Sequence, residues 1–336
     1  MKRIGLMGCG SVANYGHIPA LLRSNSLDLV AVYDPDPSRL EVVTEKHDIT
    51  SVFDDVNEFM NSGIDAVTIT SPAPVHIDNI RAAAKAGKPV LCEKPLAMTE
   101  DESREIIRIA ADAGITVYTG FDYRFSPVSL TIRELVARKA IGEVRSLRLI
   151  YNWHCHGKYE QAANGALIEN ARRRDRMEEG GPIVDCGVHQ VDLARFWLGG
   201  DVTSWSVAGA WIDEYDAPDH VYLHMNHDSG VHTLVEMSYS YCHTCAEPVN
   251  HFTYELIGTD GVIRYNREQR LFEVRTRQGT ECLPFAHEKN FAGMYEAWSR
   301  ALSTGECGFL ATAYDGMEAA RITREAVDEL IEQRAR

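Results

Sequence analysis

The stretch that decides the fold of this chain is Gly8-Cys9-Gly10-Ser11-Val12-Ala13. It matches the pattern G-x-G-x-x-A, follows a predicted strand at residues 3–7 and opens a predicted helix at residues 13–24. In such a turn the first glycine permits a tight bend, the second lets a ligand approach the backbone, and a small third residue lets helix and strand pack closely. Because the free N–H groups of a helix N-terminus attract phosphate, the stretch predicts a dinucleotide site at Gly8, Gly10, Ser11 and Val12. An ordinary turn between strand and helix is the alternative.

An acidic residue at the end of the second predicted strand indicates which dinucleotide binds. Asp34 directly follows the predicted strand at residues 27–33. A carboxylate at this position accepts hydrogen bonds from ribose hydroxyls and repels a 2′-phosphate, which favours NAD over NADP. Arg39 lies nearby and would soften the preference, but we expect it on the surface of the next helix. NADP is therefore the less favoured cofactor.

Predicted strands and helices alternate along the first third of the chain. The strands are expected at residues 3–7, 27–33, 66–70, 89–92 and 115–119, and the helices at residues 13–24, 37–47, 75–86 and 99–113. Thr99 followed by Glu102 is a capping-box pattern at the start of the last of these helices. Such alternation predicts right-handed βαβ units and a parallel sheet.

The pattern changes after Gly142, where predicted strands follow one another. They are expected at residues 144–153, 202–212, 221–227, 230–241, 252–258, 261–266 and 271–277, before helices at residues 291–302 and 311–332. Asp228-Ser229-Gly230 and Thr259-Asp260-Gly261 are typical of hairpin turns. A mostly antiparallel sheet follows, with helices on one face. Its open face predicts a homo-oligomer.

Charge and composition narrow the classes of partner. The 336 residues carry a formal net charge of -15, which repels nucleic-acid phosphates. No apolar run approaches the ~20 residues that span a bilayer, and no signal peptide is visible. The 8 cysteines lack the spacing of a disulfide framework, and neither His154-Cys155-His156 nor Cys242-His243-Thr244-Cys245 belongs to a convincing four-ligand zinc set. We therefore expect a cytoplasmic protein with no metal and no nucleic-acid or membrane partner.

Two further motifs carry residues suited to catalysis. Cys92-Glu93-Lys94-Pro95 ends a predicted parallel strand, which places Lys94 at the sheet edge where ligands bind. Its ammonium group can hydrogen-bond a substrate hydroxyl and lower the pKa of that hydroxyl, although this motif alone favours an ordinary surface lysine. From Pro182 onward a helix is predicted in which Asp185, His189 and Asp192 share one face. A carboxylate one turn from a histidine can orient the imidazole and raise its basicity; a solvated polar face is the alternative.

Two segments between these motifs and the later strands are candidates for substrate specificity. In Tyr151-Asn152-Trp153-His154-Cys155-His156, strand alternation would place Trp153 and Cys155 on one face and the histidines on the other, as a wall for a sugar or as ordinary strand packing. Residues 157–181 form a polar segment with a predicted helical core at residues 166–178. One of its arginines could bind an anionic substrate group, whereas a solvated helix with an Arg174–Glu178 pair is the preferred alternative. The basic residues are Arg172, Arg173, Arg174 and Arg176.

Taken together, these motifs resemble the glucose-fructose oxidoreductase / inositol dehydrogenase (Gfo/Idh/MocA) family. The resemblance covers about the first 200 residues, and the strand-rich remainder agrees with the family's second domain. The matching segments, in the family's order, are Gly8 to Ala13, Thr70-Ser71-Pro72 followed by His76, Cys92 to Pro95, Gly120 to Pro127, and Asp185-Cys186-Gly187-Val188-His189.

The resemblance implies an α/β fold in two domains. Residues 1–122 would form a Rossmann dinucleotide-binding domain. Residues 123–336 would form a substrate-binding and oligomerisation domain with a large, mostly antiparallel open sheet, and the last helices could pack back on the first domain. Dimers or tetramers through the open sheet are expected. The implied reaction is reversible hydride transfer between NAD(P) and a ring carbon that bears a hydroxyl, usually on a sugar or cyclitol.

The resemblance also implies residue roles. Lys94 would hold the reacting hydroxyl and the nicotinamide ribose, His189 would be the general acid/base, and Asp185 would bind a substrate hydroxyl and assist His189. Ala73 stands where the family more often has asparagine, which puts one hydrogen bond near the ribose in doubt. The implied cofactor-binding residues, beyond the glycine turn, are Asp34, Arg39, Thr70, Ser71, Pro72, His76, Glu93, Lys94 and Arg124. The expected substrate-binding residues are Lys94, Tyr123, Trp153, His154, Asp185 and His189.

Two other functions are compatible with these motifs. The first is a glycosidase that keeps NAD tightly bound and oxidises its substrate only transiently. The second is a non-enzymatic NAD-binding regulator, against which the presence of Lys94, Asp185 and His189 argues.

Overall fold

The computed structural model describes residues 1–336, which divide into two compact units. Unit 1 comprises Met1–Ser126 and Lys289–Arg321, and unit 2 comprises Pro127–Glu288 and Ile322–Arg336. The segment 289–321 therefore belongs to unit 1, whereas a domain boundary at residue 122 alone would place it in the second unit. The physical reason is burial, because Trp298 of this segment packs into the same apolar core as Ile4.

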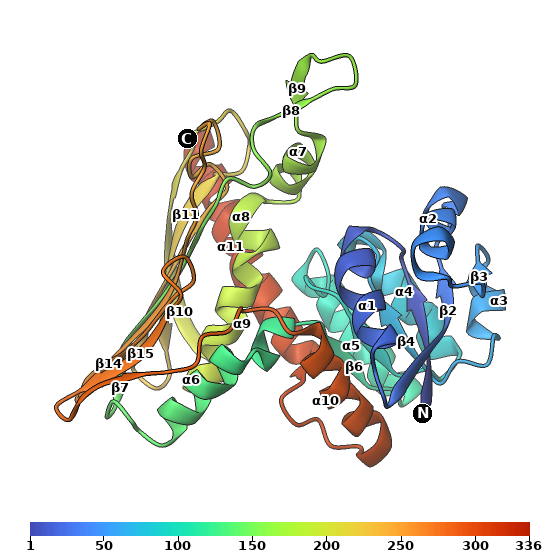
Figure 1. The fold of residues 1–336 in the computed structure, drawn as a ribbon, viewed down its shortest axis with the longest axis horizontal. Coiled ribbons are helices and arrows are strands. Elements are labelled where there is room, and N and C mark those ends of the chain that lie inside the picture. The colour runs from blue at the N-terminus through green and yellow to red at the C-terminus, as the bar shows by residue number, and fades with distance from the viewer. The chain divides into compact units, whose positions relative to one another are not determined.

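Unit 1 is a doubly wound sheet (Figure 1) with strand order β17-β6-β5-β4-β1-β2-β3. Its strands are β1 (Lys2–Met7), β2 (Leu27–Tyr33), β3 (Val52–Phe53), β4 (Ala66–Ile69), β5 (Val90–Cys92), β6 (Val117–Thr119) and β17 (Ala311–Thr312). Its helices are η1 (Ala13–His17), α1 (Ile18–Leu22), α2 (Pro37–His47), α3 (Val56–Met60), η2 (Ala73–Val75), α4 (His76–Lys85), α5 (Glu100–Ala113), η3 (Asp122–Phe125) and α10 (Phe291–Thr304). All strand pairs are parallel except that of β17 with β6, so the predicted parallel sheet is confirmed.

Apolar side chains bury both faces of this sheet. One core contains Ile4 and Leu6 of β1 with residues of α1 and α10, including Leu21 and Trp298. The other contains residues of β1, β4 and β5 with residues of α3, α4 and α5. Coverage on both faces explains why these strands have nearly continuous apolar sequences.

The sequence prediction missed the shorter elements of unit 1. It contained neither β3, α3 nor β17, because two-residue strands and a one-turn helix are too short to show a periodic pattern. The first predicted helix is present, but it begins as the π-helical turn η1 before continuing as α1.

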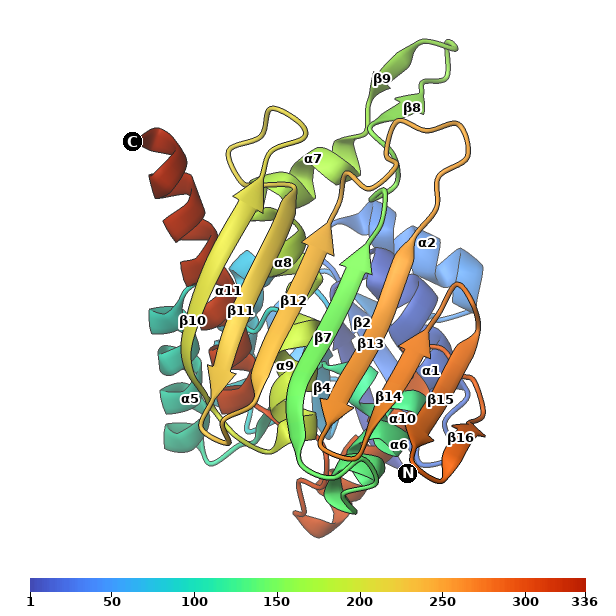
Figure 2. The same cartoon turned by 90° about the vertical axis from the view of Figure 1, so that its left-hand side faces the viewer.

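Unit 2 is built on an eight-stranded sheet with the order β10-β11-β12-β7-β13-β14-β15-β16 (Figure 2). Its strands are β7 (Val144–Asn152), β10 (Val202–Ala210), β11 (His220–His227), β12 (His232–Ser238), β13 (His251–Gly258), β14 (Gly261–Asn266), β15 (Leu271–Thr276) and β16 (Gly279–Cys282). A separate hairpin pairs β8 (Tyr159–Gln161) with β9 (Leu167–Glu169). The helices of unit 2 are α6 (Pro127–Ala137), α7 (Ala171–Glu178), α8 (Gly181–Asp185) and α9 (Gly187–Leu198), and the last helix α11 (Ala313–Ala335) contributes residues to both units. Only β7 and β12 pair in parallel, so the expected mostly antiparallel sheet is confirmed.

Helices of unit 2 cover one face of its sheet and leave the other face open (Figure 2). Alternation along β11 reflects this arrangement: Val221, Leu223 and Met225 are buried, whereas Tyr222 and Asn226 are exposed. An oligomer formed through the open face stays a prediction. No helix of the structure combines the length and the apolar content needed to cross a membrane.

Three expectations for unit 2 were wrong in detail. β7 ends at Asn152, and Cys155 and His156 have φ values of 37° and 67°, so strand alternation does not apply to residues 153–156. The helix expected at residues 166–178 begins only at Ala171, because β9 occupies the preceding residues. The helix expected from Pro182 onward is broken at Cys186. The prediction also lacked α6 and β16.

The capping box at the start of α5 provides a test of the fold. Thr99 Oγ1 accepts a hydrogen bond from the Glu102 N–H at 3.2 Å, and Glu102 Oε2 accepts one from the Thr99 N–H at 3.2 Å. We expect Thr99→Ala to lower the free energy of unfolding by about 1 kcal/mol, because the Glu102 N–H loses its side-chain acceptor. Thr99→Ser, which keeps the hydroxyl, is the control. Urea unfolding that gives equal values for all three proteins would contradict this role of the cap.

Candidate active site

The glycine turn of unit 1 has the geometry that a dinucleotide requires. Gly8 has φ +97°, and a Cβ at this position would lie 2.4 Å from the backbone nitrogen of Ser71. Gly10 is different, because a Cβ placed there meets no atom within 4 Å. Gly8 is therefore needed for the bend, and Gly10 leaves open space in front of the turn. That space and the nearby start of the helix fit a pyrophosphate.

The Asp34 carboxylate fixes the glycine turn to the end of β2. Asp34 is buried, and its Oδ2 accepts a hydrogen bond from the Cys9 N–H at 2.8 Å, while Oδ1 accepts one from the Asp36 N–H at 3.0 Å. Burial and the charge of Asp34 raise the pKa of the Cys9 thiol to about 12, so Cys9 stays protonated. Arg39 lies on the surface, as expected, but its Nη1 comes within 3.7 Å of Asp34 Oδ2.

The residues after β4 support the turn from the next strand. Thr70 Oγ1 donates a hydrogen bond to the Gly8 carbonyl oxygen at 2.6 Å, and Ser71 Oγ accepts one from Asn79. His76 is buried, with Nε2 2.8 Å from the Ser71 carbonyl oxygen and Nδ1 3.0 Å from that of Pro95. Burial lowers the pKa of His76, although its carbonyl contacts oppose that shift, and the ring lies between the loops that follow β4 and β5. Pro72, also expected at the cofactor, is exposed beside this loop.

A buried polar chain connects Glu93 to α10. His17 Nε2 donates to Glu93 Oε1 at 2.8 Å, and His17 Nδ1 lies 2.7 Å from the Tyr295 hydroxyl, which donates to Thr68 Oγ1 at 3.3 Å. Burial raises the pKa of Glu93, but the hydrogen bond and charge of His17, together with the charge and backbone N–H of Lys94, hold that pKa below its usual value. Sequence reasoning missed His17 and Tyr295, because they lie 278 residues apart and neither belongs to a motif.

Lys94 follows β5 at the carboxyl edge of the sheet, as predicted. Because β1, β4 and β5 are adjacent and parallel, Lys94 and the glycine turn lie at the same edge. The two other expected residues of this unit lie in η3. Tyr123 and Arg124 are both buried, and Arg124 Nη2 lies 3.5 Å from Asp315 Oδ2. The structure thus shows Arg124 in contact with the C-terminal part of the chain.

The acid/base candidates of unit 2 lie on either side of a helix break. Asp185 is the last residue of α8, whereas His189 and Asp192 belong to α9. All three side chains are buried, so the alternative of a solvated polar face is wrong. Asp185 Oδ2 accepts a hydrogen bond from the Tyr239 hydroxyl and forms an ion pair with Arg176 Nη1. These two partners were not identified from the sequence.

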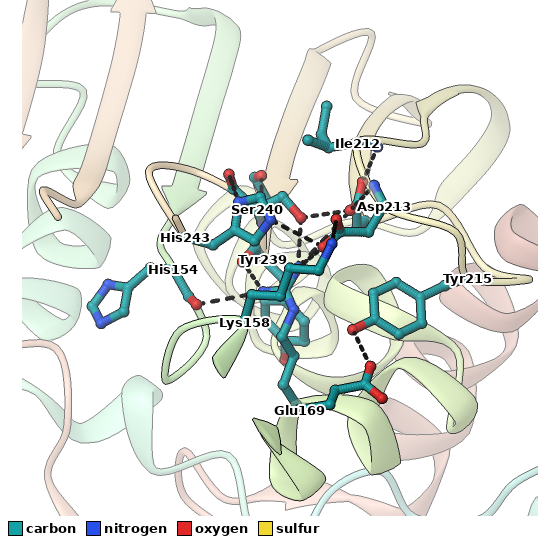
Figure 3. A network of polar contacts seen from close by, with 12 residues as sticks. His154, Lys158, Glu169, Ile212, Asp213, Tyr215, Tyr239, Ser240 and His243 are labelled. Carbon is teal, nitrogen blue, oxygen red and sulfur yellow. Dashed lines mark hydrogen bonds and ion pairs between the residues drawn. The ribbon is translucent and has the colours of Figure 1, made fainter. Parts of the chain in front are cut away.

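The aromatic segment after β7 turns rather than continuing as a strand. The Trp153 ring stacks on Tyr151 with centroids 5.8 Å apart and meets Tyr239 edge-on at 5.6 Å. His154 Nδ1 lies 3.3 Å from Asn250 Oδ1. In Figure 3 the His154 ring points away from the polar network that surrounds Asp213. Trp153 therefore contacts Tyr239, the hydrogen-bond donor to Asp185, whereas the ring of His154 is directed toward Asn250.

The basic cluster of α7 is not uniformly solvated. Arg173 is fully buried, and its Nη2 lies 3.2 Å from Asp213 Oδ2. Figure 3 shows the polar network around Asp213, in which Lys158 Nζ lies 2.5 Å from Asp213 Oδ1 and His243 Nε2 lies 3.0 Å from Asp213 Oδ2. The expected Arg174–Glu178 pair is present at 3.8 Å. The solvated-helix interpretation is thus right for Arg174 and wrong for Arg173.

Comparison with known proteins identifies both units. Residues 2–121 match the oxidoreductase family model with an NAD-binding Rossmann fold, and residues 129–264 match the GFO/IDH/MocA C-terminal domain. The chain is 30% identical to an inositol 2-dehydrogenase from Acidothermus cellulolyticus over 98% of this chain and 92% of that protein. It is 28% identical to a D-xylose 1-dehydrogenase (NADP(+)) from Haloferax volcanii over 90% and 89% of the two chains.

A solved structure shows the same fold. The inositol dehydrogenase homolog from Azotobacter vinelandii, complexed with NAD+, superimposes with a TM-score of 0.81 and 20% identity, covering 98% of this chain and 95% of that chain. The fold, the glycine turn and these relatives define an NAD(P)-dependent dehydrogenase that acts on CH–OH groups of a polyol or sugar. The chain belongs to the Gfo/Idh/MocA oxidoreductase family.

The two glycines of the turn provide a matched pair of variants. We expect Gly8→Ala to destabilise unit 1 by more than about 3 kcal/mol, because the new Cβ would meet the Ser71 backbone at a positive φ. Gly10→Ala should leave the free energy of unfolding within about 0.5 kcal/mol of wild type, because its Cβ has room. Its methyl group would nevertheless fill the space for the pyrophosphate, so the Kd for NAD should rise at least about tenfold. Calorimetry that finds an unchanged Kd for Gly10→Ala would place the pyrophosphate elsewhere.

The His17–Glu93 pair predicts that substitutions of the two residues have non-additive effects on the free energy of unfolding. His17→Ala would remove the imidazole donor of the buried carboxylate and leave it the Lys94 N–H, so we expect the free energy of unfolding at pH 7 to fall by about 3 kcal/mol. The double variant His17→Ala/Glu93→Gln should lose less than the single one, because no buried charge remains. In wild type this contribution is present above the unfolded-state pKa of Glu93 and is lost as the pH falls through the lower folded-state value. Additive losses in denaturant unfolding would contradict the coupling.

Proposed function

We propose that the protein transfers a hydride reversibly between a ring secondary alcohol of a sugar, sugar derivative or cyclitol and NAD. The observation that supports this most directly is the position of Lys94. It follows β5 at the same sheet edge as a glycine turn whose geometry fits a dinucleotide. In open parallel sheets, ligands bind at this carboxyl edge. A lysine there can reach both a cofactor and the alcohol on which the cofactor acts.

Each proposed residue has a separate chemical task. A bound NAD would supply the acceptor for the hydride that leaves the alcohol carbon. Lys94 donates a hydrogen bond to the alcohol oxygen and stabilises the negative charge that develops on it. His189 takes the hydroxyl proton, because an imidazole is basic near neutral pH. Asp185, held as a carboxylate by Arg176 and Tyr239, accepts a hydrogen bond from a substrate hydroxyl.

The cofactor preference is proposed from Asp34. Its buried carboxylate lies at the end of β2 and would oppose a 2′-phosphate in the same place. Arg39 is close to Asp34, but its charge is balanced by Asp34 and Asp36, both within 3.7 Å of it. NAD is therefore the proposed cofactor, although one relative is named for NADP(+).

Removal of the proposed acid/base groups should abolish turnover while the protein stays folded. We expect His189→Ala and Lys94→Ala each to lower kcat on the best polyol by at least about 100-fold, since positioned acid/base groups contribute about 10²–10⁴-fold. His189→Ala should bind NAD as wild type does. Steady-state NADH formation and calorimetric NAD titration check this. His287→Ala and Lys85→Ala, which change exposed residues, are the controls. Turnover within a few-fold of wild type in both site variants would overturn the assignment.

A further inference from the structure

One buried arginine fixes α7 to the sheet of unit 2. The guanidinium of Arg173 donates to the Tyr239 carbonyl oxygen, to Ser240 Oγ at 2.6 Å and to Asp213 Oδ2 at 3.2 Å. Figure 3 shows these three partners gathered within one network. A helix held in this way keeps its other side chains in defined positions. Arg176, three residues further along α7, is therefore presented from a rigid support.

Arg176 lies beside the carboxylate that the proposed function assigns to substrate binding. Its Nη1 pairs with Asp185 Oδ2, which also accepts the hydrogen bond from the Tyr239 hydroxyl. Burial, together with the charge of Asp185, raises the pKa of Tyr239 well above its usual value, so this hydroxyl stays a donor. The Asp185 carboxylate faces a guanidinium and a hydroxyl donor, and a carboxylate in this setting acts as an acceptor of hydrogen bonds, including those from a ligand.

The guanidinium of Arg176 has N–H groups that are not used by Asp185. It carries five N–H groups, and Asp185 is its only hydrogen-bond or ion-pair partner in the structure. Its side chain is 29% exposed, whereas that of Asp185 is 6% exposed. None of its nitrogens is both buried and unsatisfied. Arg176 therefore offers accessible N–H donors next to a fixed acceptor.

The charges around this pair favour an uncharged ligand. Three of the four arginines of α7 have acidic partners within unit 2: Arg173 with Asp213, Arg174 with Asp175 and Glu178, and Arg176 with Asp185. The fourth, Arg172, is exposed, so solvent screens its charge. An anion that approached Arg176 would also meet the negative charge of Asp185 at close range. Adjacent hydroxyls fit better, because one oxygen can accept from Arg176 while the neighbouring O–H donates to Asp185.

We propose that Arg176 is a substrate-binding residue, and that Arg176 and Asp185 together bind two adjacent hydroxyls of an uncharged polyol. This inference rests on the proposed function, because it names the class of substrate that the dehydrogenase site takes. It also assigns a role to one arginine of the basic segment, for which the sequence left two possibilities open, an anion site and a solvated helix.

The test uses the full-length protein with saturating NAD. The variants are Arg176→Gln, which removes the charge, and Arg176→Lys, which keeps it. Arg174→Gln, an exposed position on the same helix, is the matched control. The substrates are myo-inositol and D-glucose, the monodeoxy analogues of each, and D-glucuronate, which differs from D-glucose by one carboxylate. Thermal unfolding verifies that each variant is folded.

For wild type we expect kcat/KM on myo-inositol or D-glucose to exceed that on at least one of its monodeoxy analogues by about tenfold or more, because a site that pairs with a hydroxyl discriminates against a substrate that lacks it. The kcat/KM on D-glucuronate should not exceed that on D-glucose. Arg176→Gln should raise KM for the parent polyol at least about tenfold and change kcat by less than about threefold. It should also lose the discrimination against that one analogue. Arg176→Lys should recover part of the loss, and Arg174→Gln should behave as wild type.

Two outcomes would overturn this inference alone. The first is that Arg176→Gln lowers kcat/KM by the same factor on the parent polyol and on every analogue, which would mean that Arg176 only positions Asp185. The second is a wild-type preference for D-glucuronate that Arg176→Gln abolishes, which would indicate an anion site. If wild type oxidises no polyol, ligand-observed NMR of the NAD complex decides. If wild type binds the parent polyol, and Arg176→Gln weakens this binding but not the binding of the deoxy analogue, the inference is supported and the hydride transfer is rejected. Absence of any polyol binding would reject both.

Discussion

The cofactor-binding edge of unit 1 depends on the contacts that hold the glycine turn in place. Gly8 lies so close to the Ser71 backbone that a Cβ would not fit, and its carbonyl oxygen accepts a hydrogen bond from the Thr70 hydroxyl. The next residue, Cys9, donates its N–H to the buried Asp34 carboxylate. Three neighbouring strands therefore fix one turn, and the direction of the following helix is set by it. Lys94, which follows β5, lies at the same edge of the sheet as this turn.

Buried charges in both units follow a common arrangement. Glu93 is stabilised by His17, and Asp185 is stabilised by Arg176 and Tyr239. In each unit a carboxylate removed from water keeps its charge because a donor faces it, which is the condition for burying an ion at tolerable cost. A carboxylate held in this way is a fixed acceptor rather than a proton shuttle. That property leaves proton transfer to His189 in the proposed reaction.

The sequence was sufficient for features that depend on local patterns. The parallel and antiparallel sheets, the capping box at Thr99 and the glycine turn followed from periodicity, turn residues and spacing. The break at Cys186 and the turn after Asn152 did not, since the residues on either side continue a pattern that looks regular in a single sequence. Partners such as Tyr295 could not be predicted, because a buried polar chain between distant segments has no signature in a single sequence.

The most direct measurement of the central claim follows the hydride itself. A polyol that the protein oxidises is prepared with deuterium on every ring carbon and incubated with NAD, and the NADH that is released is examined by mass spectrometry and proton NMR. Direct transfer from a ring CH–OH to the nicotinamide predicts one deuterium per NADH, located at C4 of the nicotinamide ring, and a matching amount of ketone. NADH without deuterium, or turnover of the polyol without release of NADH, would contradict the account.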